Sequence, residues 1–424
     1  MMNWLQLHEL DIWTVVVGIL CSVPCAMLGC YLLLRKMSLL GDAISHAILP
    51  GLVVAFLLTG TLSGWAMAMG AGILGILTAY FTQAINRWTA VSEDASMGVV
   101  FTSLFALGVI LISRYASQVD LDPGCVLYGL IEFTALDTVE IWGWDVPRSC
   151  LSLAPLLLVT ILFVVLFWKE LKLVAFDSAL ADAMGFRSSR VHYLLMAMVA
   201  SATVASFEAV GSILVVAMLI VPPATAHLLC DRLKSMMMVA VLISVLSTIL
   251  GYIGAVYWNT SVAGMMASTS GAIFALTVFI APQHGLISKW LRRNWLMLTI
   301  TLEDVLGELY RKEENNRSTR KIPAPAWWRR LARNYGWYRG LLNYQAGQFQ
   351  LTPAGREKAS QLVRTHRLWE TFLSTHLDLP SDHLHDPADR MEHFISPDLH
   401  QQIASELAHP KLDPHGKPIP DKPE

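Results

Sequence analysis

An aspartate and a histidine stand four residues apart within a long apolar stretch near the N-terminus, at Asp42 and His46. On a helix this spacing places a carboxylate and an imidazole on one face, where the two can hold a divalent cation. The alternative is a carboxylate at a helix end beside a hydrogen-bonded histidine. Because ionisable side chains are costly inside a membrane, such a pair in an apolar stretch is a candidate functional site.

Further metal-ligating residue types gather in the last third of the chain, which holds nine of the thirteen histidines. They form two sets on predicted helices, namely His366 with Glu370, and His385 and Asp389 with Glu392 and His393. Neighbouring members of each set are mostly three or four residues apart, a spacing that brings side chains together on one helix face. Carboxylates and imidazoles gathered in this way can bind a metal ion, and the alternative is a solvated helix surface.

The composition indicates which kinds of domain carry these residues. The chain has 424 residues, of which 54% are hydrophobic and 15% charged, whereas soluble domains carry about 25% charged residues. Residues 1–283 contain 11 Lys and Arg against 16 Asp and Glu, and residues 284–424 contain 20 against 17. This pattern predicts a membrane domain followed by a soluble domain, and it excludes an ordinary soluble enzyme.

Nine stretches are apolar and long enough for transmembrane helices: about 12–34, 43–59, 63–81, 96–113, 150–168, 192–206, 209–229, 236–257 and 262–281. We expect Pro50-Gly51 to interrupt the second stretch and Pro222-Pro223 the seventh. No cleavable signal peptide is expected, because the first apolar run can itself span the membrane.

The loops between these stretches predict the orientation of the chain. Nine basic residues fall on one side: Arg35, Lys36, Arg87, Lys169, Lys172, Arg187, Arg190, Arg232 and Lys234. Arg114 and Arg148 fall on the other side. Cytoplasmic loops carry the excess of positive charge, so the N-terminus is expected outside and the C-terminal domain in the cytoplasm. In the largest basic loop, Asp177 can cap a short helix that Gly185 ends.

Five motifs resemble the permease subunits of zinc, manganese and iron ABC importers. They are RKMSLLGDAISHAILPG at 35–51, EDASMGVVF at 93–101, KELKLVAFD at 169–177, AVGSILV at 209–215 and VPPATA at 221–226. The resemblance covers about residues 10–285 and implies the fold of type II ABC importers, as a homodimer or a pair of related permeases. It also implies a metal path past Asp42 and His46 and a coupling helix at about 177–186 that contains Asp177, Ala181 and Gly185.

The energy source is expected to lie in another subunit. The sequence contains no G-x-x-x-x-G-K-[ST] motif, so it offers no Walker-type ATP site. A separate ABC ATPase subunit would supply ATP hydrolysis, and an extracytoplasmic metal-binding protein would deliver the ion.

The tail resembles the metal-dependent repressors of the diphtheria-toxin-repressor and manganese-repressor family. The matching motifs are LTPAGR at 351–356, THRLWE at 365–370, LHDPADRMEHFIS at 384–396 and PHGKPIP at 414–420. By position, one implied metal site contains His366, Glu370 and His385, and the other contains Asp389, Glu392 and His393 with Asp304 as a fourth ligand. The roughly 40 residues between Tyr310 and Leu351 are too few for the family's complete winged helix-turn-helix, and the chain ends before the SH3-like domain of some relatives.

We therefore expect an all-α polytopic membrane domain of about nine transmembrane helices at 1–285 and a membrane-exit linker at 286–300. A degenerate winged-helix-like segment at 301–350 and a small, mainly α metal-binding and dimerisation domain at 351–424 follow. The expected function is that of a permease subunit, not an enzyme, in an ATP-driven divalent-metal importer of the bacterial plasma membrane, with a metal-sensing tail. The tail sets contain no thiolate, which favours Mn²⁺ or Fe²⁺ and leaves Zn²⁺ allowed.

Two alternatives remain open at this stage. The tail can be a metal-dependent DNA-binding regulator, with contacts from Arg329, Arg330, Arg333 and Arg339, or a dimerisation clamp that binds no metal. The same four arginines can instead contact a membrane surface or the ATPase.

Overall fold

The computed structural model describes residues 4–37, 40–60, 64–115, 131–141, 143–315, 324–345, 347–377, 384, 387–388, 391–395, 397–408 and 410–421. The chain divides into two compact units. We call Met1–Ser288 the membrane unit and Lys289–Glu424 the tail unit.

The membrane unit is almost entirely helical. Its elements are α1 (Trp4–Leu34), α2 (Leu40–Ala47), α3 (Leu49–Thr59), α4 (Gly64–Trp88), α5 (Glu93–Tyr115), α7 (Ile131–Thr134), β1 (Thr138–Ile141), β2 (Trp144–Pro147), α8 (Arg148–Leu166), α9 (Trp168–Phe176), α10 (Ser178–Ala183), α11 (Ser188–Leu229), α12 (Leu233–Trp258) and α13 (Val262–Ile280). Strands β1 and β2 pair as a short antiparallel hairpin.

The part of the chain that the structure describes offers eight helical segments long and apolar enough to cross a membrane. They are Asp11–Leu34, Leu40–Thr59, Asp94–Tyr115, Arg148–Leu166, Ser188–Phe207, Ala209–Leu229, Leu233–Trp258 and Val262–Ile280. All eight coincide with expected spans. The remaining expected span, 63–81, falls on α4, a helix of 25 residues.

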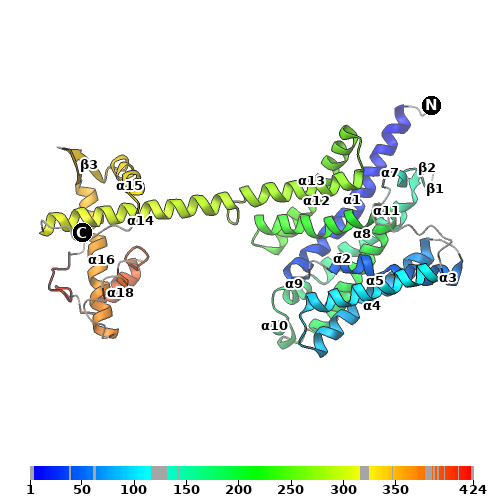
Figure 1. Cartoon of the computed structure of the whole chain (residues 1–424), viewed down its shortest axis with the longest axis horizontal. Coiled ribbons are helices and arrows are strands. Elements are labelled where there is room, and N and C mark those ends of the chain that lie inside the picture. Colours follow the sequence, from blue (N-terminus) through cyan, green and yellow to red (C-terminus); the bar gives the residue numbers. More distant parts are fainter. Residues whose placement is uncertain are drawn as a thin grey trace. The chain divides into compact units, whose positions relative to one another are not determined.

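Helix α1 packs against α8, α11 and α12 (Figure 1). Its Cys21, Cys25 and Cys30 are fully buried in the hydrophobic core of this unit. Helix α2 packs against α4, α5 and α11, and these contacts fix the short helix that carries Asp42 and His46.

The expected break in the second span is present, because α2 ends at Ala47 and α3 begins at Leu49 with Pro50 in its first turn. The expected break at Pro222-Pro223 is wrong, since α11 runs through both prolines and leaves helical geometry at Gly211 instead (φ 77°). Proline lacks an N–H, so Pro223 leaves the carbonyl of Leu219 unbonded within the helix. A Cβ at position 29 would lie 1.9 Å from that oxygen, so Gly29 of α1 allows the close approach.

Beyond α13 the chain forms α14 (Leu286–Asn315), α15 (Ala326–Tyr338), β3 (Leu342–Gln345), β4 (Gln348–Leu351), α16 (Pro353–Leu377) and α18 (Pro397–Glu406). One core of the tail unit joins α14, α15, β3 and α16 through Leu302, Val305, Leu306, Ala332, Leu342 and Ala359. A second core contains Leu368, Ile403, Ala404 and Ile419.

Residues 350–356 form the end of a strand, a turn and the start of α16. Strand β4 ends at Leu351, the Thr352 hydroxyl accepts a hydrogen bond from the Gly355 N–H (3.1 Å), and Pro353 is the first helical residue. Among its described residues, the winged-helix-like segment expected at 301–350 contains the end of α14, the helix α15 and the antiparallel hairpin β3–β4.

Candidate metal sites

Asp42 and His46 lie on one face of α2, as their spacing predicts. His46 Nε2 is 3.6 Å from Asp42 Oδ1, and both side chains are partly exposed. On its other side the imidazole meets Phe105 of α5 edge-on, with ring centroids 5.7 Å apart. The pair therefore offers one oxygen and one nitrogen ligand at a position that α5 helps to fix.

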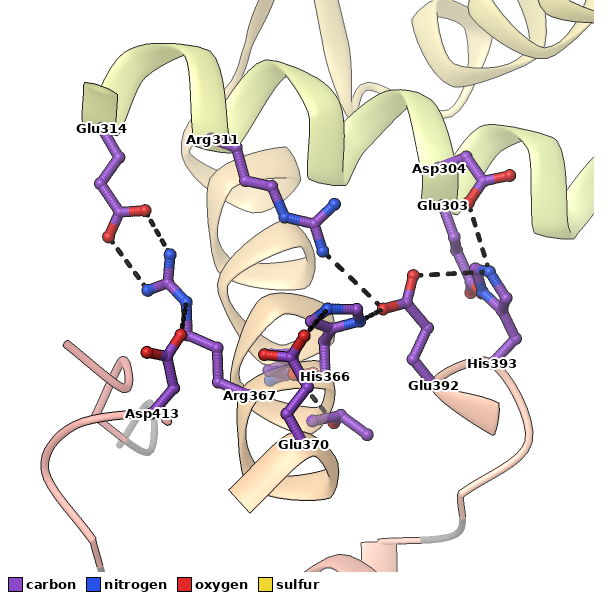
Figure 2. Close-up of polar contacts among 12 residues, drawn as sticks. Glu303, Asp304, Arg311, Glu314, His366, Arg367, Glu370, Glu392, His393 and Asp413 are labelled. Atoms are coloured by element: carbon purple, nitrogen blue, oxygen red, sulfur yellow. Dashed lines mark hydrogen bonds and ion pairs between the residues drawn. The ribbon is translucent and has the colours of Figure 1, made fainter. Parts of the chain in front are cut away.

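In the tail unit, three side chains from two segments converge closely enough to hold a metal ion. Ligand atoms of Asp304, Glu392 and His393 all lie within 4.8 Å of one another. His393 Nε2 is 3.4 Å from Asp304 Oδ1 and 3.7 Å from Glu392 Oε1 (Figure 2). Glu392 is buried, and Asp304 and His393 are partly buried. Two carboxylates and one imidazole match the donor chemistry of a divalent-metal site.

Glu303 was not singled out from the sequence, although it precedes Asp304 directly. Its Oε2 atom lies 2.9 Å from His393 Nδ1, and its Oε1 atom pairs with Lys358 Nζ at 3.2 Å. Glu303 therefore orients the imidazole ring and leaves Nε2 directed toward Asp304 and Glu392. Outer partners of this kind commonly fix the ring orientation of a metal-ligating histidine.

The second expected set shares a residue with the first. His366 Nδ1 lies 2.5 Å from Glu392 Oε2, and His366 Nε2 lies 3.1 Å from Glu370 Oε1. Figure 2 shows Glu392 between His366 and His393. The Arg311 guanidinium also approaches Glu392 Oε2, at 3.8 Å. The structure thus connects the two sets through one carboxylate, while His385 and Asp389 lie outside the described residues.

Glu392 and His393 lie in a turn that directly follows helical residues, since residues 387, 388 and 391 are helical. The Glu392 N–H still bonds the Ala388 carbonyl at 2.9 Å, in helical register, but residues 392–394 form a turn. Glu392 is 4% exposed, so its carboxylate depends on the surrounding cations.

A buried arginine fastens the C-terminal segment to the helices of this site. Arg367 of α16 forms a two-point ion pair with Glu314 of α14, with N–O distances of 2.5 and 3.0 Å. It also lies 3.7 Å from Asp413 and donates to the Pro418 carbonyl. Bidentate pairs of this kind add geometric specificity, so α14 and α16 are held in a defined register.

The surrounding carboxylates control protonation of both histidines. Burial alone would lower the pKa of His393, but hydrogen bonds to Asp304 and Glu303 and the charge of Glu392 outweigh it and raise this pKa to about 9. Burial also lowers the pKa of His366, but the hydrogen bonds to Glu370 and Glu392 and the charges of these two carboxylates outweigh burial and raise this pKa. In the metal-free chain at neutral pH, His393 is therefore an imidazolium that donates to Glu303.

Raising the pH is expected to destabilise the metal-free tail unit. The pKa of His393 is raised from the ordinary 6.5 to about 9 in the folded chain. The protonated imidazole therefore stabilises the folded tail unit fully below pH 6.5, and this stabilisation is lost as pH rises through 9. The loss amounts to at most about 3 kcal/mol. This loss of stability can be measured by thermal unfolding of the full chain in the presence of a chelator, with a spectroscopic probe on the tail unit, between pH 6 and pH 9.5. A His393→Gln variant should lose most of this pH dependence, and an unchanged slope in that variant would contradict the assignment.

The loop expected to contain a coupling helix does contain a short helix, α10. Asp177 precedes α10, and its Oδ1 atom accepts a hydrogen bond from the Leu180 N–H at 2.9 Å. Ala181 is fully buried, and Gly185 follows the helix with φ 87°. The Asp182 carboxylate accepts hydrogen bonds from the Ser188 N–H and hydroxyl, which lower its pKa. Sequence and structure therefore agree on a short, capped helix between α9 and α11.

Comparison with known proteins supports the resemblances predicted for both parts of the chain. Residues 8–281 match the ABC 3 transport family, and residues 352–421 match the iron dependent repressor, metal binding and dimerisation domain. The manganese transport system membrane protein MntD of Bacillus subtilis (strain 168) is 44% identical over 283 residues, which are 66% of this chain and 96% of the relative. The zinc transport system membrane protein TroD of Treponema pallidum (strain Nichols) is 39% identical over 286 residues, 68% of this chain and 78% of the relative.

A solved structure shares the fold of the membrane unit. The structure described as PsaBC from Streptococcus pneumoniae in complex with Fab is 31% identical, covers 66% of this chain and 93% of its own, and has a TM-score of 0.55. The predicted resemblance to metal importer permeases and metalloregulators is thereby confirmed. The chain belongs to the ABC 3 transport family: it is a membrane permease subunit of a divalent-metal ABC transporter, not an enzyme, and it carries a C-terminal domain of the metal-dependent repressor type.

Proposed function

We propose that this chain imports Mn²⁺ or Fe²⁺ in preference to Zn²⁺, and that metal bound at Asp304, Glu392 and His393 slows the import. The observation that carries the proposal is the convergence of these three side chains within 4.8 Å, from α14 and the 391–395 turn. The cluster contains carboxylates and an imidazole but no thiolate, and such donors suit harder ions. Relatives named for manganese and for zinc both occur, so the family itself leaves the ion open.

Asp42 and His46 are proposed to contact the ion in transit. They supply one oxygen and one nitrogen ligand on the same face of α2, 3.6 Å apart. The helix break at Ile48 follows directly, and interrupted helices often mark a substrate path.

The proposed orientation places the N-terminus outside the bacterial plasma membrane and the tail unit in the cytoplasm, which the excess of loop Lys and Arg on one side supports. A separate ABC ATPase would dock at residues 177–186, an extracytoplasmic metal-binding protein would deliver the ion, and a second permease copy or paralogue would complete the pore.

The tail site lies on the helix that follows the last span. Helix α13 ends at Ile280, and α14, which carries Asp304, begins at Leu286. A bound divalent ion supplies two positive charges to a cluster rich in carboxylates. Asp304, Glu392 and His393 would hold that ion, with the two carboxylates no longer accepting the His393 proton, and the 391–395 turn would thereby be fixed to α14. Coupling of this turn to α14 is the proposed route from metal occupancy to transport.

Transport by the reconstituted chain with its ATPase tests this regulation. Raising Mn²⁺ on the ATPase side should slow radiolabelled Mn²⁺ uptake by the wild-type chain and leave the rate of an Asp304→Asn variant unchanged. Glu313→Gln, an exposed change on the same helix, is the matched control and should behave as wild type. Equal inhibition of the wild-type and Asp304→Asn chains would refute regulation by this site, and exclusive transport of Zn²⁺ would refute the choice of ion.

Replacing Asp177 by alanine is expected to reduce coupling between the ATPase and transport. The change removes the acceptor for the Leu180 N–H and costs about 1 kcal/mol of local helix stability. The ATPase subunit should still copurify, while metal transported per ATP hydrolysed falls relative to a Ser178→Ala control. A wild-type ratio in Asp177→Ala would show that α10 does not depend on its cap for coupling.

A further inference from the structure

The segment between the two tail-unit helices α14 and α16 has an unusual charge distribution. From residue 316 to residue 352 the sequence contains no Asp or Glu, but it contains seven basic residues: Arg317, Arg320, Lys321, Arg329, Arg330, Arg333 and Arg339. Helix α15 and the β3–β4 hairpin both lie within this stretch. The segment thus supplies positive charge and no carboxylate of its own.

Helix α15 has one face committed to the core. Ala332 and Gly336 are buried, and a Cβ at Gly336 would lie 2.7 Å from Leu302 of α14 and 2.9 Å from Leu342 of β3. Tyr335 packs edge-on against Trp295 of α14, with centroids 5.4 Å apart. These contacts determine which side chains of α15 point away from the tail unit.

The opposite face, which we call the α15 outer face, consists of Trp327, Arg330, Leu331, Asn334, Trp337 and Tyr338, all exposed. Most of these residues recur at helical spacing, so they lie on one side of the helix. Trp327 is 59% exposed, Trp337 60% and Tyr338 84%. Large aromatic side chains and an arginine are therefore combined on one exposed surface.

This combination suits a lipid surface better than a nucleic acid. Tryptophan and tyrosine rings favour the membrane–water interface, and arginines near it gain from attraction to anionic lipids. Direct readout of DNA depends instead on polar side chains that form hydrogen bonds with base edges. Trp327, Leu331 and Trp337 would find few partners in a DNA groove.

The covalent connection to the membrane strengthens this interpretation. The last span ends at Ile280, and α15 begins at Ala326. A tethered segment meets the bilayer at a high effective concentration, so even weak interfacial affinity suffices. The exposed Trp290 and Trp295 of α14 extend the same residue types toward α15.

We propose that the α15 outer face docks on the anionic lipid surface of the bilayer that this chain itself spans. Its aromatic rings enter the interface. Arg330 of this face and the exposed Arg339, which directly follows the last residue of α15, bind the negatively charged headgroups. The proposal concerns where the tail unit is held and does not depend on metal binding by the tail.

Fluorescence of the full chain in nanodiscs tests the docking. An Asn334→Cys variant carries an environment-sensitive NBD label, and the parent chain treated in the same way provides the background. Emission and quenching by doxyl-labelled lipid should be higher in discs of phosphatidylcholine with phosphatidylglycerol than in discs of phosphatidylcholine alone. Combining Arg330→Gln with Arg339→Gln should lower the ratio of docked to undocked tails by about tenfold or more.

Two further variants separate docking from misfolding. Trp327→Ser with Trp337→Ser should abolish quenching in both lipid compositions, and Lys411→Gln with Lys417→Gln, which removes the same charge elsewhere in the tail unit, should leave quenching unchanged. Thermal unfolding confirms that each variant is folded. Equal emission in the two lipid compositions would overturn the proposal. So would binding of a DNA duplex that the double arginine variant abolishes, because it would assign this surface to nucleic acid.

Discussion

Replacing Asp42 or His46 by alanine is expected to abolish metal uptake by the assembled transporter. Each change removes one of the two ligands that α2 presents, and the remaining side chain cannot hold the ion alone. Uptake of radiolabelled Mn²⁺ into proteoliposomes should fall to the level seen without ATP. Both variants should still insert into the membrane and copurify with the ATPase subunit, because α2 is held by its packing against α4, α5 and α11.

A second Asp–His pair in the membrane unit provides the matched control. Asp231 Oδ1 lies 3.7 Å from His284 Nε2, and both side chains are exposed. Asp231→Ala should therefore transport at the wild-type rate. Wild-type uptake by Asp42→Ala and His46→Ala would show that the ion does not contact this pair.

A Glu392→Gln change is expected to weaken Mn²⁺ binding by the tail by at least about tenfold. Loss of an outer partner of a metal ligand already costs 10- to 100-fold in affinity, and Glu392 is itself a candidate ligand. Glutamine conserves volume, so the change reports on charge and coordination rather than on packing. Calorimetry of the detergent-solubilised full chain, in a His46→Ala background that removes the proposed transport site, isolates the tail contribution.

Glu406→Gln serves as the control for Glu392→Gln. Glu406 is exposed and pairs with His376 at 3.2 Å, so its neutralisation should leave Mn²⁺ affinity unchanged. A thermal melt in chelator accompanies both variants, because removing a buried carboxylate leaves the His366 and Arg311 cations less well paired. Unchanged affinity in a folded Glu392→Gln chain would mean that the cluster is an ion-pair network without metal.

The features that sequence predicted well are local ones. The four-residue spacing of Asp42 and His46 alone determines that they share a helix face, and the apolar runs alone determine eight of the spans. The cap at Asp177 also depends only on neighbouring residues. In each case the interaction closes within one or two helical turns, so the order of residues is sufficient.

The features that sequence missed depend on contacts between distant segments. Glu392 meets His366 only because the 391–395 turn packs against α16, 26 residues earlier in the chain. Glu303 reaches His393 across 90 residues. The close approach of α1 to α11 at the Leu219 carbonyl requires a glycine at position 29, which no pattern within α11 can reveal.

The carboxylates around His393 link metal sensing to acidity. With the pKa of His393 raised to about 9, a metal ion that binds its Nε2 atom must displace a proton throughout the physiological range. One displaced proton means that each unit of acidification raises the free metal concentration for half-occupancy about tenfold. Under the proposed regulation, the set point of this importer is therefore a ratio of metal to protons, and an acidified cytosol would resume import at a metal level that halts it at neutral pH.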